Sequence, residues 1–434
     1  MLKVMKFGGT SVGTQAAIES LLAIVTLDQA AQKVVVVSAQ SGVTNLLLQC
    51  LDDTELMERV DDRILGLAME LGVESIVVKP WLAALRKDLQ LDLPREEVAD
   101  RVASYGELIS AQLLAAFFSL RGMEAEAVDT RGLVVTDACF GNAAYLLGLT
   151  RARLRRSIRP LLERRILPIL TGFIGATRQG QTTTLGRGGS DLTATLVGQC
   201  LDADCVEIWS DQDGMMTADP RLVTGTRLLA SMSYPEAVEC ANFGAKILCA
   251  RSLIPAIAAG IPVKVLNTFN PNCSGTTIST QSHGGNFVVT AQSGISAVTV
   301  YNPAMIGAVG YLARLFRVFS QQGLSVDIVA ASEASVTATV EGLNEVQQSS
   351  LVARLSALGE ISVRPMRALL AVISPLLQSH ALMGDLLGVL KANQIAVDVI
   401  SFGNSALNLT LVVPEQCVRQ ALQICHDFML QFSN

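Results

Sequence analysis

Apolar segments of strand length alternate with stretches of helical periodicity from Met1 to about Asn270. Strands are expected at 34–37, 166–170, 206–209 and 263–266. Each of these segments is almost wholly apolar, as strands buried on both faces are. Because each is bounded by helix-patterned stretches, the connections favour parallel pairing. The sequence therefore predicts an α/β fold in which helices sandwich a mainly parallel sheet.

The limits of this first domain follow from turn and helix signals. The region 55–122 is largely helical, with Pro80 and Pro94 marking breaks, and is expected to form a helical subdomain or a lid over the sheet. Turn-forming residues are concentrated between Pro271 and Gly285. The first domain is therefore expected to occupy residues 1–275.

Residues 286–434 contain an internal repeat. An offset of 71 residues relates Asp327 to Asp398, and the strand candidates 336–340 and 407–411 coincide at the same offset. Each copy reads strand, helix, strand, strand, helix, and the first copy closes with a strand near 361–363. The second copy has no closing strand of its own.

An unpaired sheet edge would therefore be left in the second copy. We expect the uncharged strand 287–291 to fill it. The first copy, about 295–366, is then nested inside a second made of about 286–294 plus 367–434. A plain tandem whose edge is covered by another subunit is the alternative.

Composition excludes several classes of partner. A net charge of -6 and a pI near 5.3 argue against a nucleic-acid or anionic-membrane surface. The nine cysteines include no Cys-x-x-Cys pair, which favours a reduced, cytoplasmic chain without a structural metal. The first ten residues do not resemble a signal peptide, and polar residues interrupt the uncharged stretch 287–313, so no membrane span is expected.

Two glycine-rich loops are typical of anion binding. Residues 182–191 combine hydroxyls, glycines, Arg187 and the pair Ser190-Asp191, which we expect to cap the helix that follows. At the N-terminus, an apolar strand ending in Lys6-Phe7 runs into glycines and then a helix with Thr14 as its expected cap. The spacing matches neither a dinucleotide-binding loop nor a P-loop. Lys6 is either a surface lysine or a point charge for a phosphate.

Other loops add polar groups at strand ends. Residues 38–45 follow one strand and open a helix expected at Leu46, and Asp211 and Asp213 follow another strand, where they could bind Mg²⁺ or ribose or simply form a turn. Glu107, taken alone, reads as a solvated helix residue. Lys246 stands at a helix start, where it gains nothing from the helix dipole. Lysines, an arginine, backbone amides and carboxylates are what phosphoryl transfer requires.

The six motifs Lys6–Ser11, Ser38–Asn45, Gly106-Glu107, Thr182–Asp191, Trp209–Asp211 and Phe243–Lys246 together resemble those of aspartate kinases, of the amino acid kinase fold. The resemblance covers essentially the whole chain, because that family also ends in paired α+β ACT domains of ferredoxin-like type. It implies ATP-dependent phosphorylation of the L-aspartate β-carboxylate, the entry to lysine, threonine and methionine synthesis, with Mg²⁺ accompanying ATP.

The resemblance also implies roles for individual residues. The catalytic pair would be Lys6 and Asp191. Aspartate would be held by Thr44, Glu107, Phe173, Arg187, Gly188 and Ser190, with Arg187 on its α-carboxylate and Glu107 on its ammonium group. MgATP would be held by Lys6, Gly8, Gly9, Ser11, Ser210, Asp211, Met216, Arg221 and Lys246.

Two departures from the family pattern concern binding. Met216 stands where relatives often have Tyr, which is expected to weaken nucleotide contacts, and Cys249 stands where they often have His. In the repeat, the resemblance implies a lysine-effector pocket lined by Met305, Ala308, Tyr311, Leu312, Ser325, Asp327, Ser332 and Glu333. The alternative is that Asp327 lies at a dimer interface. The repeats are expected to form a homodimer or a dimer of dimers.

The sequence is compatible with two rival functions. The chain could be a kinase of another amino acid, such as glutamate or acetylglutamate, or an amino-acid sensor whose kinase domain is silent. Intact Lys6, Arg187 and Asp191 argue against the sensor. No dinucleotide-binding pattern follows the repeat, so fusion to a homoserine dehydrogenase is not expected.

Overall fold

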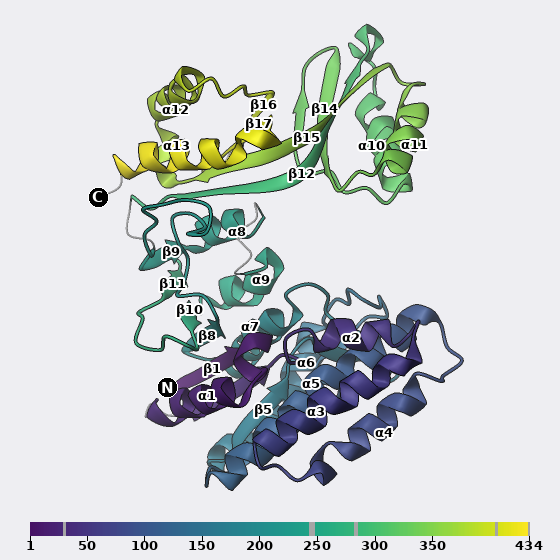
Figure 1. Ribbon diagram of the computed structural model, residues 1–434, viewed down its shortest axis with the longest axis vertical. Coiled ribbons are helices and arrows are strands. Elements are labelled where there is room, and N and C mark those ends of the chain that lie inside the picture. The colour runs from purple at the N-terminus through teal and green to yellow at the C-terminus, as the bar shows by residue number, and fades with distance from the viewer. Residues whose placement is uncertain (29–31, 243–247, 282–284, 404–406, 433–434) are drawn as a thin grey trace. The chain divides into compact units, whose positions relative to one another are not determined.

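The computed structural model describes residues 1–28, 32–242, 248–281, 285–403 and 407–432, which form two compact units (Figure 1). Unit one comprises Met1–Met215, Leu228–Val238 and Lys246–Ser282; unit two comprises Met216–Arg227, Glu239–Ala245 and His283–Asn434. The segment Met216–Arg227 thus belongs to unit two, although it lies within the stretch 1–275 that the sequence assigns to one domain. The domain limits drawn from the sequence stay a prediction.

Unit one is built on an eight-stranded sheet that contains all four strands expected above. Its strand order is β3-β5-β2-β1-β8-β10-β11-β9, and the strands from β3 to β10 in that order are parallel. β11 is antiparallel to β10 and parallel to β9. The strands are β1 (Leu2–Phe7), β2 (Gln32–Val37), β3 (Ala125–Val128), β5 (Leu167–Thr171), β8 (Cys205–Ser210), β9 (Ser231–Ser233), β10 (Val263–Asn267) and β11 (Thr276–Ser279).

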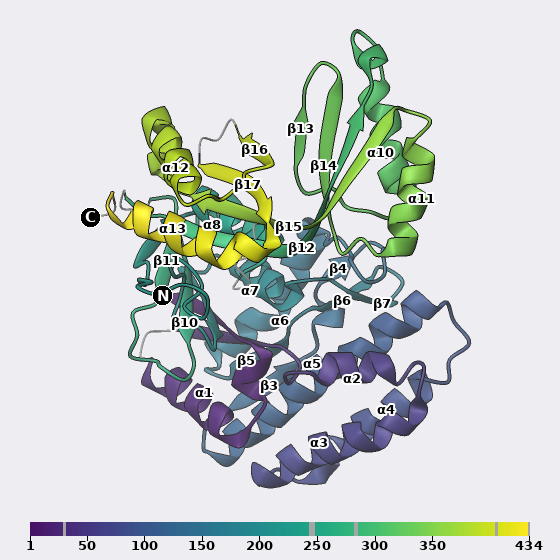
Figure 2. The same ribbon diagram turned by 45° about the horizontal axis from the view of Figure 1, so that its top comes forward.

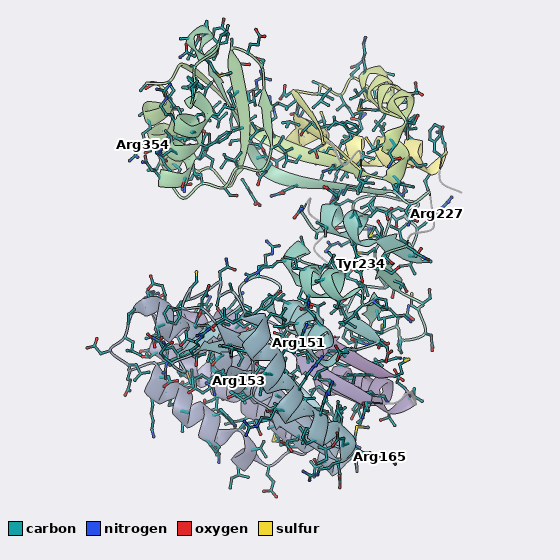
Figure 3. The ribbon with its side chains drawn as sticks, turned by 180° about the vertical axis from the view of Figure 1, so that it is seen from behind. Arg151, Arg153, Arg165, Arg227, Tyr234 and Arg354 are labelled. Carbon is teal, nitrogen blue, oxygen red and sulfur yellow. The ribbon has the colours of Figure 1, made fainter. Side chains whose placement is uncertain are left out.

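Helices surround this sheet. They are α1 (Gln15–Leu27), α2 (Val43–Gln49), α3 (Met57–Glu70), α4 (Lys79–Asp88), α5 (Arg95–Leu120), α6 (Leu147–Glu163), α7 (Gly189–Leu201) and α9 (Ala250–Ala259), and α8 (Tyr234–Asn242) is divided between the two units. Figure 3 views the molecule from behind, where Arg151 and Arg153 mark α6. The helical region expected at 55–122 consists of α3, α4 and α5, with Pro80 in the first turn of α4 and Pro94 as the N-cap of α5.

The long helix α5 is the central core helix of unit one. Eighteen of its residues are buried, among them Phe117 and Phe118, which join the same hydrophobic core as Met5 and Val35 of the sheet. Among the described residues, α5 is also the one helix long and apolar enough to cross a bilayer. Its burial inside the unit accounts for that apolar composition.

A small sheet leads into the glycine-rich loop at 186–190. It has the order β4-β6-β7, with β4 (Val135–Thr136), β6 (Ile174–Thr177) and β7 (Thr182–Thr184). The helix after it begins at Gly189, and its N-cap is Gly188 in the left-handed conformation, with φ 72°. The expected cap of Ser190-Asp191 is therefore wrong: both residues already lie in the first helical turn.

The other two predicted helix starts differ in outcome. Thr14 caps α1, accepting a hydrogen bond from the Ala17 amide, as expected. The helix after β2 begins at Val43 and not at Leu46, because Gly42, with φ 80°, lets the chain enter the helix one turn earlier.

Unit two contains a six-stranded antiparallel sheet of order β13-β14-β12-β15-β17-β16. Its strands are β12 (Val288–Tyr301), β13 (Val329–Ala331), β14 (Ser335–Glu341), β15 (Glu360–Ile373), β16 (Val399–Phe402) and β17 (Asn408–Pro414). The two long strands β12 and β15 pair along nearly their whole length, with a register shift between Gln292 and Ala297. Before the shift β12 pairs residues 288–292 with 369–373, and after it β12 also pairs with β14.

The helices of unit two gather at the two ends of these long strands (Figures 1 and 2). They are α10 (Tyr311–Gln321), α11 (Glu345–Leu355), α12 (His380–Ala392) and α13 (Val418–Leu430). α10 and α11 pack into one core with Val298 and Val336, while α12 and α13 pack into another with Val289 and Leu411. The second core also contains Ala218 and Val223 of the segment Met216–Arg227.

Candidate active site

A cavity of about 460 Å³ opens in unit one where several strands and one helix end or begin. Lys6 comes from β1, Ser38 follows β2, Phe173 follows β5, and the glycine-rich loop enters α7. Carboxyl ends of parallel strands and a helix N-terminus are where open α/β sheets bind ligands. The lining residues are Lys6, Ser38, Thr44, Glu107, Phe173, Gly186, Arg187, Gly188, Gly189, Ser190 and Asp191.

Lys6 and Asp191 form an ion pair in this cavity. The Lys6 Nζ lies 2.6 Å from Asp191 Oδ1, and Lys6 is only 8% exposed, so the surface-lysine interpretation is wrong. The strand alternation of β1 turns Lys6 toward α7, and Asp191 stands in the first turn of α7, where a carboxylate is favoured by the helix dipole. A cation buried at a strand end is held ready for an anionic ligand.

Glu107 is buried, contrary to the solvated interpretation. Glu107 is 3% exposed, and its Oε1 accepts a hydrogen bond of 3.0 Å from the Ala39 amide. The neighbouring Gly106 makes this possible, because a Cβ there would lie 2.6 Å from the Ala39 Cβ. Burial raises the pKa of Glu107 to about 8, although the Ala39 hydrogen bond and Lys6 oppose that shift. Its buried Oε2 has no hydrogen-bond partner among the described residues.

Arg187 stands on a tightly packed turn. The residue is exposed, and among the described residues no ion pair or hydrogen bond is recorded for its guanidinium group. Gly186 and Gly188 on either side have φ 74° and 72°, and a Cβ on Gly188 would lie 2.5 Å from the Cβ of Cys249. The turn therefore requires glycine on both sides of Arg187, an exposed residue that lines the cavity.

Phe173 carries backbone strain inside the site. It is one of few non-glycine residues with positive φ, at 67°, and it holds this conformation while its amide donates to Thr193 Oγ1 and its carbonyl accepts from Leu185. Such a conformation costs of order 1 kcal/mol or more and persists where surrounding contacts impose it. The ring packs over Gly189, whose Cβ would lie 2.6 Å from it.

The residues expected around ATP in unit one lie at neighbouring strand ends. Phe7 of β1 pairs with Trp209 of β8, so Gly8, directly after β1, and Ser210, the last residue of β8, lie at the same edge of the sheet. The Gly8 amide donates to the Trp209 carbonyl, and Ser11 Oγ lies 2.7 Å from Thr268 Oγ1. A Cβ on Gly9 would lie 2.7 Å from the Ala39 carbonyl oxygen, so the loop must be glycine there.

The two acidic residues after β8 differ in exposure and in hydrogen bonding. Asp211 is exposed at this edge of the sheet. Asp213 accepts hydrogen bonds from the side chains of Asn267 and Asn270, so for this residue the structure favours the interpretation as a turn-forming residue. Among the described residues, no group of three or more His, Cys, Asp or Glu side chains that could hold a metal ion is found.

The structure does not assemble the whole predicted nucleotide set in one unit. Met216 and Arg221 belong to unit two, and the Arg221 guanidinium pairs with Asp219. Lys246 lies outside the described residues.

The predicted effector residues of unit two are mostly brought together. A cavity of about 530 Å³ is lined by Met305, Ile306, Gly307, Ala308, Val309, Gly310, Tyr311, Leu312, Ser332 and Glu333. Ser325 and Asp327 are not among these lining residues. Asp327 instead lines another hollow, of about 480 Å³, together with Gln292 and Thr410, and partial desolvation and the negative charge of Glu341 raise its pKa.

The sequence prediction missed three residues that line the active-site cavity. Ser38 belongs to a loop already singled out for its hydroxyls, and Gly186 and Gly189 belong to the glycine-rich loop. The signal for all three was present in the motif. Their place in the cavity depends on how the loops meet.

Comparisons with known proteins agree on one family. The family model for the amino acid kinase family matches residues 1–267. The chain is 31% identical to aspartokinase 3, chloroplastic, of Arabidopsis thaliana over 98% of this chain and 81% of that protein. It is 31% identical to lysine-sensitive aspartokinase 3 of Escherichia coli over 99% of both.

Solved structures give the same result. The crystal structure of E. coli aspartokinase III in complex with aspartate and ADP matches with a TM-score of 0.86 at 30% identity, covering 99% of this chain and 100% of that one. The structure of the same enzyme in complex with lysine and aspartate matches with a TM-score of 0.85. The chain therefore belongs to the amino acid kinase family and, within it, to the aspartokinases. Its unit one carries the kinase fold, and its repeats are ACT domains.

Proposed function

We propose that the chain phosphorylates L-aspartate with ATP, giving ADP and 4-phospho-L-aspartate, in the cavity of unit one. A β-carboxylate oxygen of aspartate attacks the γ-phosphorus, and the bond from that phosphorus to the β,γ-bridging oxygen breaks as ADP leaves. The observation that carries this proposal is the Lys6–Asp191 ion pair of 2.6 Å in the same cavity as Arg187 and Glu107. This charge pattern is complementary to an amino acid that bears a second carboxylate.

Catalysis then depends on charge and position. In this proposal Lys6 neutralises the transferring phosphoryl group, and Asp191 orients Lys6. Arg187 binds the α-carboxylate of aspartate through its planar guanidinium, and Glu107 binds the α-ammonium group. Thr44, Phe173, Gly188 and Ser190 complete the aspartate site. The unpartnered Oε2 of Glu107 supports its assignment, because a buried carboxylate oxygen without a partner is costly.

We assign the nucleotide to Lys6, Gly8, Gly9, Ser11, Ser210 and Asp211, with Met216, Arg221 and Lys246 assigned from the family resemblance alone. Mg²⁺ fits these residues as an ion carried mainly by the phosphates, because it usually takes only one or two protein carboxylates. Asp211 is the exposed carboxylate at this edge of the sheet. When bound, Mg²⁺ would neutralise charge on the β- and γ-phosphates.

We further propose that L-lysine inhibits the enzyme through the ACT domains. The cavity beside α10 offers the Glu333 carboxylate and the aliphatic wall of Met305 and Leu312, which suit an ammonium group on an apolar stem. Ser325 and Asp327 stay part of the proposed effector set on the family resemblance. We place the enzyme in the cytoplasm and expect a homodimer, or a dimer of dimers, through the ACT domains.

One assay tests the reaction. ADP release is measured with MgATP and aspartate, glutamate or N-acetylglutamate, and the acyl phosphate is trapped with hydroxylamine. We expect turnover with aspartate and its suppression by lysine but not by threonine alone. Preferential turnover of either glutamate compound would identify another amino acid kinase. Lysine binding without any aspartate-dependent turnover would identify a silent sensor.

A further inference from the structure

Helix α5 carries buried carboxylates along one face. Glu97, Asp100 and Glu107 are spaced by three and seven residues, which places them on the same side of a helix. They are 7%, 4% and 3% exposed. Glu107 lines the active-site cavity, whereas Asp100 lies two helical turns earlier and does not line it. Asp100 therefore needs another explanation.

Asp100 binds two segments of backbone at once. Its carboxylate accepts hydrogen bonds of 3.0 and 2.9 Å from the Gly141 amide, and bonds of 2.7 Å from both the amide and the hydroxyl of Thr184. No ion pair between Asp100 and a cationic side chain is recorded in the described parts of the chain. A buried charge compensated only by uncharged donors is costly, so its contacts must fix something that the fold requires.

The two segments held by Asp100 flank Arg187. Thr184 ends β7, two residues before the turn that carries Arg187, and Gly141 belongs to the loop that packs against that turn. A Cβ on Gly186 would lie 2.7 Å from Asn142 Oδ1 and 3.1 Å from the Gly141 carbonyl oxygen. The Ala143 amide donates to the Thr184 carbonyl, at 2.9 Å. The loop and the turn therefore form one packed layer.

Arg251 of α9 also binds this layer. Its guanidinium donates to the Leu185 carbonyl at 3.1 Å, to the Ala143 carbonyl at 2.7 Å, and to Asn142 Oδ1. Leu185 is the residue between Thr184 and the turn. Asp100 and Arg251 thus both hold the backbone that leads into Arg187, and neither residue lines the cavity.

We propose that Asp100 and Arg251 are positioning residues that fix Arg187 relative to Glu107, so that the site accepts both charged groups on the α-carbon of aspartate. This inference rests on the proposed function. The α-ammonium and α-carboxylate groups share one carbon, so the separation of their two partners must be set closely. Glu107 and Asp100 lie on the same helix. By binding the segment that leads into the Arg187 turn, Asp100 therefore fixes the position of that turn relative to Glu107.

The expected effect is specific to aspartate. Loss of a residue that orients a binding group typically lowers affinity or activity by about 10–100-fold. We expect Asp100→Asn to raise KM for aspartate by about that factor, with KM for ATP nearly unchanged. The amide keeps the shape of the carboxylate but presents an NH₂ group to donors. Glu97→Gln is the matched control, because Glu97 is buried on the same helix face and accepts one hydrogen bond, from Gln181.

The test is steady-state kinetics of the full chain with each substrate varied in turn, together with thermal unfolding of each variant. Arg187→Ala is combined with Asp100→Asn. If Asp100 acts through Arg187, the second substitution adds little to KM for aspartate once Arg187 is absent. Asn142→Ala, in an exposed loop, and Arg251→Lys provide variants that test the same layer if Asp100→Asn does not fold.

The inference is supported if Asp100→Asn raises KM for aspartate but not KM for ATP, and if this effect is not additive with that of Arg187→Ala. If Asp100→Asn does not fold, the same two criteria apply to Asn142→Ala and Arg251→Lys. It is overturned if the folded variants leave KM for aspartate unchanged, raise both KM values alike, or add fully to Arg187→Ala. A wild-type chain without aspartate-dependent ADP release would overturn the proposed function and this inference together. Active wild type with unaffected variants overturns the inference alone.

Discussion

Aspartate binding should depend on pH through Glu107. Burial raises the pKa of this carboxyl group to about 8 in the free protein. At pH 6 only about 1% of the groups are ionised, and at pH 8 about half are. If the ammonium group of aspartate requires the carboxylate, ionising Glu107 at pH 6 costs about 3 kcal/mol. The bound ammonium then keeps Glu107 ionised, because an adjacent positive charge lowers the pKa.

The sign of the effect follows directly. The free protein carries an extra proton below pH 8 and must release it to bind aspartate, so affinity rises with pH. KM for aspartate should fall by about 50-fold from pH 6 to pH 8 and level off above that range. At pH 7, calorimetry in buffers of different ionisation enthalpy should detect release of about 0.9 proton per aspartate bound.

Glu107→Gln provides the discriminating variant. It keeps the shape of the side chain but cannot ionise, so its KM for aspartate should be raised at pH 8, by about 10-fold or more for a lost charged hydrogen bond. That KM should be nearly flat with pH, without proton release. KM for ATP, measured in parallel, is the internal control. A wild-type KM for aspartate that changes less than about threefold between pH 6 and 8, or a Gln variant with the wild-type slope, would refute the reasoning.

Three further predictions follow from other residues. Lys6→Ala should lower kcat by about 10²–10³-fold while aspartate binding, measured by calorimetry, stays nearly intact; equal losses of binding and rate would contradict the assignment of Lys6 to the transferred group. Glu333→Gln should weaken lysine inhibition by about 10-fold or more without changing the uninhibited rate, and dose–response curves that overlay those of wild type would exclude Glu333 from the effector site. His426 is fully buried, and its Nε2 is hydrogen-bonded with Thr217 Oγ1. Burial lowers the pKa of the His426 imidazole, so this side chain binds a proton more tightly in the unfolded chain than in the folded one. Stability should therefore be lost as the pH falls below about 6.5, and less so in His426→Gln, as denaturant midpoints between pH 7.5 and 5 would show.

Local patterns predicted much of unit one. The four apolar strands were found where expected because their composition requires burial on both faces, and Thr14 caps α1 because its side chain meets an amide only three residues away. The sequence pattern places the start of α7 too late. Ser190 and Asp191 are good caps, but the left-handed Gly188 brings the chain into the helix before them.

The environment of individual residues was less accessible from the sequence. Glu107 reads as an ordinary helix carboxylate until Gly106 is seen to bring α5 against Ala39, which buries it. Asp100 offered no sequence signal, because its partners Gly141 and Thr184 are remote along the chain. The membership of Met216–Arg227 in unit two also depends on remote contacts, such as those of Ala218 and Val223 with the core beneath α13.

The sequence alone determined the alternation of strands and helices, the four apolar strands of unit one, the glycine-rich loops and the ionic side chains that accompany them. These features follow from periodicity, from backbone freedom and from charge, which act between residues close along the chain. Only the tertiary structure decided that Lys6 meets Asp191, that Glu107 is buried with a raised pKa, and that Asp100 and Arg251 both hold the backbone that leads into Arg187. Those outcomes depend on burial and on contacts between remote segments, which arise only when the sheet and helices pack together.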